Sequence, residues 1–239
     1  MIRRGLRRLL RPAALPKGFD VTGGRDAAWL ALPPSERIAS IGHRACVGGD
    51  DAEAWYGIGR LQFHVLVAQG LRHDHVFLDI ACGALRLGQF LIPCLDPGRF
   101  FGLDVQPELV EAARGVEIPE DLLALKRPVF GFNGDFDVSF VDPFDAAIAQ
   151  SLFTHMGEAD IAACFAALRP RAKRDARFWF IWFEGASDIN PTGQAHANMG
   201  WRFPFETMAG LAAQGGWRAE RIGDWNHPRG QKIALARPV

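Results

Sequence analysis

VFLDIACGALRLG, residues Val76–Gly88, is the stretch that decides the fold of this chain. An apolar run ends in Asp79, and Gly83 follows in a turn that opens a helical pattern. This order of strand, turn and helix is typical of nucleotide-binding α/β proteins. In a dinucleotide site, glycines let the backbone approach a pyrophosphate, which an acidic residue at the strand end would repel. Asp79 therefore favours a ligand that carries cationic groups, such as an ammonium and a sulfonium.

A second acidic residue closes the next apolar run, about 25 positions after Asp79. Gly102-Leu103-Asp104 ends this run, and the carboxylate of Asp104 is well placed to accept hydrogen bonds from both hydroxyls of a ribose. Either acid alone could be a helix cap or a turn residue. The pair is the more specific signal for a nucleoside ligand.

Along the rest of the chain, short apolar runs alternate with helical patterns, as expected of a parallel sheet with helices on both faces. Helical periodicity covers about residues 87–95, 161–168 and 205–214, and upstream residues 52–70. Seven strands are predicted: Val76–Ile80, Arg99–Asp104, Pro128–Phe132, Phe144–Gln150, Ala176–Phe183, Trp217–Trp225 and Lys232–Ala236.

These motifs resemble those of class I S-adenosylmethionine-dependent methyltransferases, in particular a bacterial subgroup of poorly defined acceptor. The resemblance covers roughly residues 55–238 and rests on DIACGALRLG, FFGLDVQPE, FDAAIAQSLFTHM and NHPRGQ. It implies a Rossmann-like sheet of order 3-2-1-4-5-7-6 with the last strand antiparallel. Ala81 and Leu85 stand where this loop usually has its first and third glycines, so its backbone is less permissive.

The resemblance implies S-adenosylmethionine as cofactor and gives a candidate site for it. Arg86, in the first turn of the expected helix, either reaches a carboxylate or acceptor group or extends into solvent. Asp135 and Phe136 either contact adenine or form a solvated turn, and Tyr56 either closes over the cofactor or belongs to the core. The candidate cofactor-binding residues are Asp79, Ala81, Gly83, Arg86, Asp104, Val105, Asp135, Phe136, Gln150 and Tyr56.

A separate set of residues is predicted to act on the acceptor. His155 follows the fourth strand, and its ordinary pKa of about 6.5 suits a general base for a hydroxyl acceptor, although it could equally cap a helix. Glu184, at the end of the fifth strand, and His227 are further catalytic candidates on the same rim. Turn formation does not account for the polar side chains of His227, Arg229 and Gln231, which are therefore candidates for the acceptor pocket.

The predicted activity is therefore methyl transfer to a hydroxyl of a small molecule or glycan. Nucleobase methylation is disfavoured, because an Asn/Asp-Pro-Pro-aromatic motif is absent from the sequence. Two alternatives remain open: a non-catalytic S-adenosylmethionine-binding or scaffold protein, and an NAD-linked oxidoreductase.

Composition sets the remaining expectations. The chain has 239 residues with 27 basic and 27 acidic side chains, typical of a globular protein, and no apolar run of the ~20 residues that cross a bilayer. Four cysteines without a C-x-x-C pair suggest a cytoplasmic protein without zinc.

We expect a basic tail at 1–20, able to touch an anionic inner-membrane surface, a helical cap at 21–75 and a methyltransferase domain at 76–239. The charge pattern does not favour a nucleic-acid partner.

Overall fold

The computed structural model describes residues 27–191 and 200–239, and its centre is a mixed β-sheet. The order along the sheet is β3-β2-β1-β4-β5-β8-β7, with the short β6 paired to β5. The first five strands of this order are parallel, whereas β8 is antiparallel to both β5 and β7. The strands within the described residues are β1 Phe77–Ile80, β2 Phe100–Asp104, β3 Val129–Phe132, β4 Phe144–Ala149, β5 Ala172–Glu184, β6 Arg202–Phe203, β7 Trp217–Arg221 and β8 Lys232–Pro238.

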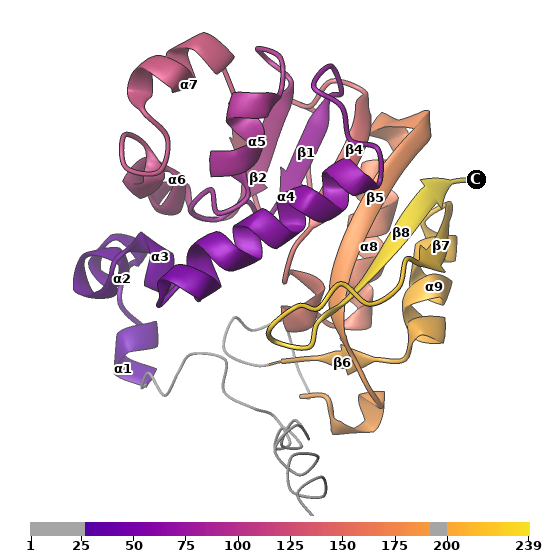
Figure 1. Ribbon diagram of the computed structural model, residues 1–239. Helices are drawn as coiled ribbons and strands as arrows, with labels where there is room; N and C mark the ends of the chain where they lie inside the picture. Colours follow the sequence, from indigo (N-terminus) through magenta and orange to yellow (C-terminus); the bar gives the residue numbers. More distant parts are fainter. Residues whose placement is uncertain (1–26, 192–199) are drawn as a thin grey trace, which may run out of the picture.

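Helices cover both faces of the sheet (Figure 1). One core cluster packs the sheet against α4 Ile58–Ala68, α5 Gly88–Cys94, α6 Pro107–Ala113 and α7 Glu120–Lys126. The other cluster packs it against α8 Glu158–Leu168 and α9 Phe205–Gln214. Every residue of β1 and β2 is buried, because helices lie on both sides of these central strands.

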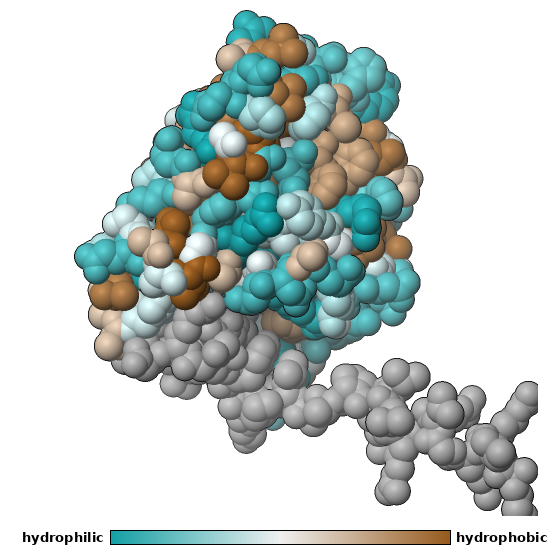
Figure 2. Space-filling view, turned by 60° about the vertical axis from the view of Figure 1, so that its left-hand side comes forward, coloured by the Kyte–Doolittle hydropathy of each residue, from teal (hydrophilic) through white to brown (hydrophobic). Residues whose placement is uncertain are grey.

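The N-terminal helices lie beside the carboxyl edge of the parallel strands (Figure 1). They are α1 Ala27–Leu30, α2 Pro34–Ile41 and α3 His43–Cys46, followed by a π-helical turn, Glu53–Gly57, that leads into α4. We refer to residues 43–57 as the cap segment. The outer face formed by α2, α6 and α7 is mostly hydrophilic, with apolar residues in scattered patches (Figure 2).

The sheet confirms the predicted fold class and strand order. The predicted helix at 205–214 has the bounds of α9. The predicted sixth strand is too long: β7 ends at Arg221, because the chain turns away at Gly223, whose φ is +98°. The elements β6, α6 and α7 were not predicted from the sequence. The strand β6 has only two residues, which is too short to show a periodic pattern.

One sequence-based expectation lies outside the described residues and another lies partly outside them. The predicted basic tail at 1–20 lies wholly outside them, as do residues 21–26 of the predicted cap. In residues 27–191 and 200–239, no helix has the length and apolar character required to cross a membrane.

Candidate functional site

The two acidic residues identified from sequence lie on neighbouring strands at the carboxyl edge. Asp79 pairs with Gly102 of β2, and Asp104 is the last residue of β2. Both are buried, with 3% and 7% of their surface exposed. The Oδ2 atom of Asp104 accepts a hydrogen bond from the Gly83 N–H at 2.8 Å, and Oδ1 accepts one from the Gln106 N–H at 2.9 Å. Asp104 therefore ties the loop after β1 to the loop after β2.

The protonation of this pair is shifted by burial. Burial, followed by the negative charge of Asp104, raises the pKa of Asp79 to about 8. Burial also raises the pKa of Asp104, although its backbone hydrogen bonds oppose the shift. Within the described residues, no donor hydrogen-bonds to the Asp79 carboxyl group. A cation placed beside Asp79 would favour its ionised form.

The loop between β1 and α5 has an alternating left-handed backbone. Ala81, Gly83 and Leu85 have φ values of 60°, 54° and 61°. Gly83 is favoured for a second reason, because a Cβ there would lie 3.2 Å from the Cγ1 atom of Val47, a tight contact that Val47 would have to shift to relieve. The helix begins only at Gly88, so the expectation that Arg86 lies in its first turn is wrong. The left-handed backbone of Leu85 accounts for the late start of this helix.

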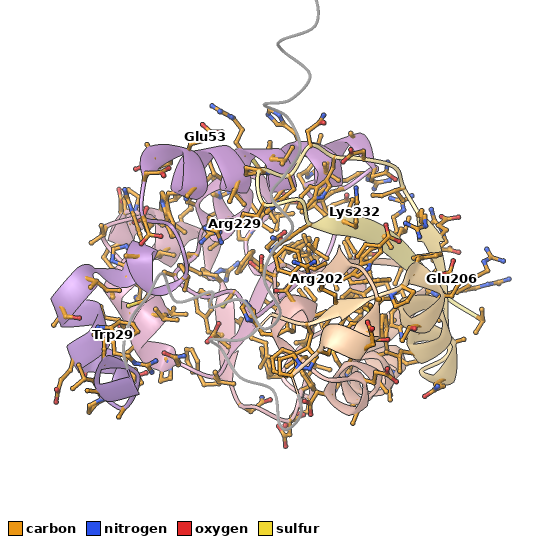
Figure 3. The ribbon with its side chains drawn as sticks, turned by 90° about the horizontal axis from the view of Figure 1, so that it is seen from below. Trp29, Glu53, Arg202, Glu206, Arg229 and Lys232 are labelled. Carbon is orange, nitrogen blue, oxygen red and sulfur yellow. The ribbon has the colours of Figure 1, made fainter. Side chains whose placement is uncertain are left out.

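The cap segment is bound to this loop and to the β7–β8 loop by two arginines. Arg86 donates a hydrogen bond from Nη2 to the carbonyl of Val47, and its guanidinium lies 5.4 Å from the ring centre of Trp55. Arg229 donates from Nη2 to the carbonyl of Gly48. In Figure 3, Arg229 lies toward the indigo N-terminal helices.

A buried carboxylate that the sequence analysis missed anchors the other end of the cap segment. Glu117 accepts hydrogen bonds from Arg44 Nε at 2.6 Å and Trp55 Nε1 at 3.1 Å, and its Oε1 lies 2.7 Å from His43 Nε2. Burial alone would raise the pKa of Glu117, but the hydrogen bonds from Arg44 and His43 outweigh it and lower the pKa. Glu117 lies in a turn after α6, and no local pattern distinguishes it from other surface glutamates.

Tyr56 belongs to the cap segment and is 41% exposed. Its hydroxyl accepts a hydrogen bond from Arg44 Nη2 at 2.9 Å. It also lines a cavity of about 340 Å³ together with α3 and residues 49–52. The structure thus places Tyr56 on the surface of the cap segment and not in the core.

The loops after β2 and β3 bring three further candidates near one another. Val105 is 61% exposed and lies beside Gly134, where an added Cβ would be 3.6 Å from Val105 Cγ1. Asp135 is exposed, whereas Phe136 is 8% exposed and has a φ of 61°. Phe136 is therefore a buried aromatic residue held in a strained conformation.

The end of β4 meets the start of β8 through a polar cluster. Gln150 Nε2 and Ser151 Oγ both donate to Gln231 Oε1, each at 3.0 Å. Ser151 has a φ of 55°. The Oε1 atom of Gln150 is buried without a hydrogen-bond partner in the described part of the chain. This cluster brings together the predicted Gln150 and Gln231.

The three catalytic candidates have different surroundings. His155 ends a 3₁₀ turn, Phe153–His155, that follows β4, and it is partly buried. Glu184 forms an ion pair with Arg221, which lowers the pKa of the Glu184 carboxyl group by hydrogen bonding. His227 is buried and stacks on Trp225, with ring centres 4.8 Å apart.

Comparison with solved structures places this geometry in a known fold. Magnesium protoporphyrin IX methyltransferase from Synechocystis PCC 6803 with bound S-adenosylmethionine is 16% identical, with a TM-score of 0.60 over 90% of this chain and 100% of that one. The chain has the class I methyltransferase fold. An S-adenosylmethionine-dependent methyltransferase from Clostridium acetobutylicum is 12% identical, with a TM-score of 0.59 over 85% and 98% of the two chains.

A TehB-like methyltransferase from Corynebacterium glutamicum is 20% identical, with a TM-score of 0.54 over 84% of this chain and 95% of that one. No protein-family model matches the sequence, and a search of curated proteins finds no significant match. At these identities the likeness concerns the class I methyltransferase fold and not a shared acceptor.

Proposed function

We propose that this protein is an S-adenosylmethionine-dependent methyltransferase that methylates a hydroxyl of a small molecule or glycan. The observation that carries the proposal is the buried pair Asp79 and Asp104, at the ends of β1 and β2, joined through the left-handed loop at 81–85. Among the structural neighbours are a putative O-methyltransferase from Nostoc punctiforme and human N-acetylserotonin methyltransferase in complex with S-adenosylmethionine.

The residues at this edge fit the proposed cofactor. The Asp104 carboxylate accepts hydrogen bonds from the Gly83 and Gln106 N–H groups, and the Val105 N–H also acts on it. Because a carboxylate offers about four acceptor positions, it can still accept a hydrogen bond from a ribose hydroxyl. Asp79, without a donor in the described residues, offers an acceptor to an ammonium group. Gly83 lets the loop backbone approach closely, and Ala81 offers only a methyl group there. Val105, Asp135, Phe136, Gln150 and Tyr56 are proposed as further contacts around this site.

The cofactor, when bound, supplies an electrophilic methyl group on a sulfonium. The protein's contribution is chiefly to orient the acceptor oxygen toward that group. His155 accepts the hydroxyl proton as the oxygen becomes more nucleophilic, which is a secondary contribution. Glu184 is a weaker candidate for this proton, because its ion pair with Arg221 stabilises the carboxylate and lowers its basicity.

Binding and turnover measurements on the full chain test the proposal and its alternatives. Calorimetry with S-adenosylmethionine, S-adenosylhomocysteine and NAD should give binding to the first two alone. Incubation with methyl-labelled S-adenosylmethionine and pools of small hydroxyl compounds and glycans should then give labelled product. Binding without transfer to any pool would favour the non-catalytic protein, and binding of NAD alone would favour the oxidoreductase.

The partners and location that accompany this function are also proposals. We propose a small molecule or glycan as acceptor, and nucleic acid is not favoured as a partner. We propose a cytoplasmic location. Peripheral contact with the inner membrane surface would come from the basic residues before Asp20.

A further inference from the structure

Three nitrogen-rich side chains meet where the cap segment, the loop after β1 and the β7–β8 loop come together. Arg86 comes from the loop after β1, and His227 and Arg229 come from the β7–β8 loop. Arg86 and Arg229 bind neighbouring carbonyls, those of Val47 and Gly48. Because Val47 and Gly48 are consecutive residues, the two guanidinium groups lie close together, and the Arg229 backbone is hydrogen-bonded to His227. The positive charges of both arginines act on the His227 ring.

The surroundings of His227 define which of its ring nitrogens carries the proton. Burial, followed by the charges of Arg229 and Arg86, lowers the pKa of His227 to about 3, so the ring is neutral near pH 7. Its Nδ1 atom lies 3.2 Å from the Arg229 backbone nitrogen and accepts that N–H. The proton of the neutral ring is therefore on Nε2. His227 presents a hydrogen-bond donor here and is not available as a base through Nδ1.

The Nε2 donor of His227 lacks an acceptor. His227 is 6% exposed, and Nε2 is buried without a hydrogen-bond partner in residues 27–191 and 200–239. An unsatisfied buried donor destabilises the folded protein, so its presence calls for an explanation. A ligand oxygen placed at Nε2 would remove this destabilisation.

Arg86 also has a buried nitrogen without a hydrogen-bond acceptor. Its Nε atom is buried without a partner in the described part of the chain, although Nη2 binds the Val47 carbonyl. Burial, and then the charge of Arg229, lower the pKa of Arg86 to about 10, which leaves it positively charged near pH 7. Among the described residues, neither Arg86 nor Arg229 forms an ion pair with an acidic side chain. The negative charge of Asp50 acts on Arg86 from a distance, without a salt bridge between the two side chains. One distant carboxylate does not neutralise two neighbouring guanidinium groups, so the pair still attracts an anion.

We infer that Arg86, His227 and Arg229 form a receptor for a compact oxyanion, such as a carboxylate, on a ligand bound at this edge of the sheet. The inference rests on the proposed methyltransferase function, in which two ligands can supply the group. One is the amino-acid carboxylate of the cofactor, and the other is an acidic group on the acceptor. Arg86 and Arg229 supply the charge, and His227 supplies a neutral donor that directs one oxygen.

A pair of substitutions at His227 isolates the Nε2 donor. His227→Asn keeps an oxygen near Nδ1 that accepts the Arg229 N–H but removes the donor, whereas His227→Gln keeps an N–H donor near the position of Nε2. Arg237→Gln, on the exposed side of β8, is the matched surface control. Circular dichroism and thermal unfolding check that each variant is folded before binding is measured.

Ligand-observed NMR on the full chain uses acetate and benzoate as probes, with acetamide and benzamide as their neutral counterparts. If the acceptor supplies the oxyanion, the carboxylates bind protein saturated with S-adenosylhomocysteine about tenfold or more tightly than the amides. His227→Asn should weaken carboxylate binding severalfold by removing one donor, and His227→Gln should restore part of it, while the two arginines keep the preference for the charged probes.

If the cofactor supplies the oxyanion, the carboxylates bind only without S-adenosylhomocysteine. His227→Asn should then weaken S-adenosylhomocysteine about tenfold but leave 5′-methylthioadenosine, which lacks the amino-acid group, unchanged. The receptor is overturned if carboxylates show no preference over amides in either state and His227→Asn leaves S-adenosylhomocysteine affinity unchanged. A failure of the proposed function can be distinguished from a failure of the receptor. It would appear as absent S-adenosylmethionine binding, and the carboxylate probes would still test the receptor.

Discussion

The loop after β1 shows how single residues can keep a glycine-type geometry without glycine. Ala81 and Leu85 occupy the left-handed region although each pays roughly 1 to 2 kcal/mol for it. Leu85 is completely buried, and Ala81 lies between Ile80 and Cys82, which are both buried. Packing therefore holds a backbone that these residue types disfavour, as is common at functional sites.

At the residue scale, Asp79 makes stability depend on pH. Its pKa of about 8 in the folded protein exceeds the unfolded value of about 3.9. Between these values the folded state binds more protons, so the free energy of unfolding should fall as pH rises from about 4 to about 8, by roughly 4 to 6 kcal/mol. Asp79→Asn should show a much smaller fall in urea denaturation without cofactor, because only Asp104 of the pair, whose pKa is also raised, would still contribute.

The control for this measurement is Asp142→Asn, an exposed carboxylate in the turn before β4. It should follow the wild-type pH dependence. Parallel curves for wild type and Asp79→Asn would contradict the raised pKa of Asp79.

Asp104 should contribute to cofactor affinity. Asp104→Asn removes a charged acceptor proposed for the ribose hydroxyls, so S-adenosylmethionine binding should weaken by roughly 1.5 to 3 kcal/mol. Calorimetry at a pH where Asp104 is ionised measures the change, with Asp142→Asn again as control. An unchanged dissociation constant in a folded Asp104→Asn protein would remove this residue from the cofactor site.

His155 should affect turnover and not cofactor binding. Once an acceptor is found, His155→Ala should lower methyl transfer by about 10²-fold or more, because a base acts in the transition state. In the pH–rate profile, the wild-type rate should rise as pH increases through the range in which a histidine loses its proton. The rate of the variant should not show this rise. Turnover close to wild type in His155→Ala would exclude the role.

At the scale of elements, Glu117 should hold the cap segment on the domain. Glu117→Gln leaves the partly exposed Arg44 and His43 without their buried carboxylate, which should lower the free energy of unfolding by about 1 to 3 kcal/mol. Limited proteolysis should cleave residues 43–57 faster in this variant. The substitution thus separates attachment of the cap from the chemistry of the site.

Glu120→Gln is the matched control for Glu117→Gln. Glu120 lies on α7 and forms an exposed pair with Arg114 at 3.4 Å, which should be worth less than about 1 kcal/mol. Equal stability and equal proteolysis of the two variants would show that Glu117 does not anchor the cap.

At the scale of the whole molecule, a net charge of zero conceals a basic start. Five arginines and Lys17 precede Asp20, the first acidic residue. If this segment meets anionic lipid, attraction of about 1 kcal/mol per basic residue should appear at low salt and vanish at high salt. Co-sedimentation with phosphatidylserine vesicles, comparing the full chain with one that lacks residues 1–17, measures it. Equal sedimentation of the two forms would contradict membrane contact.

Local patterns in the sequence were sufficient to predict the main strands and the positions of Asp79 and Asp104 at strand ends, whereas the strand order was predicted from the resemblance to class I methyltransferases. Alternating apolar runs mark buried parallel strands, and a strand end determines which edge of the sheet a residue occupies. These features depend on neighbours in the chain. The bounds of α9 follow from the same local periodicity, since Met208, Leu211 and Ala212 are its buried residues.

Tertiary structure alone decided which distant groups meet. Arg229 binds the carbonyl of Gly48, 181 positions away, and Glu117 joins residues of the cap segment. The same packing buries His227, and the Arg229 backbone N–H that binds its Nδ1 atom places the ring proton on Nε2. No local pattern encodes such contacts, because burial and the electric field at a side chain depend on every element that packs around it.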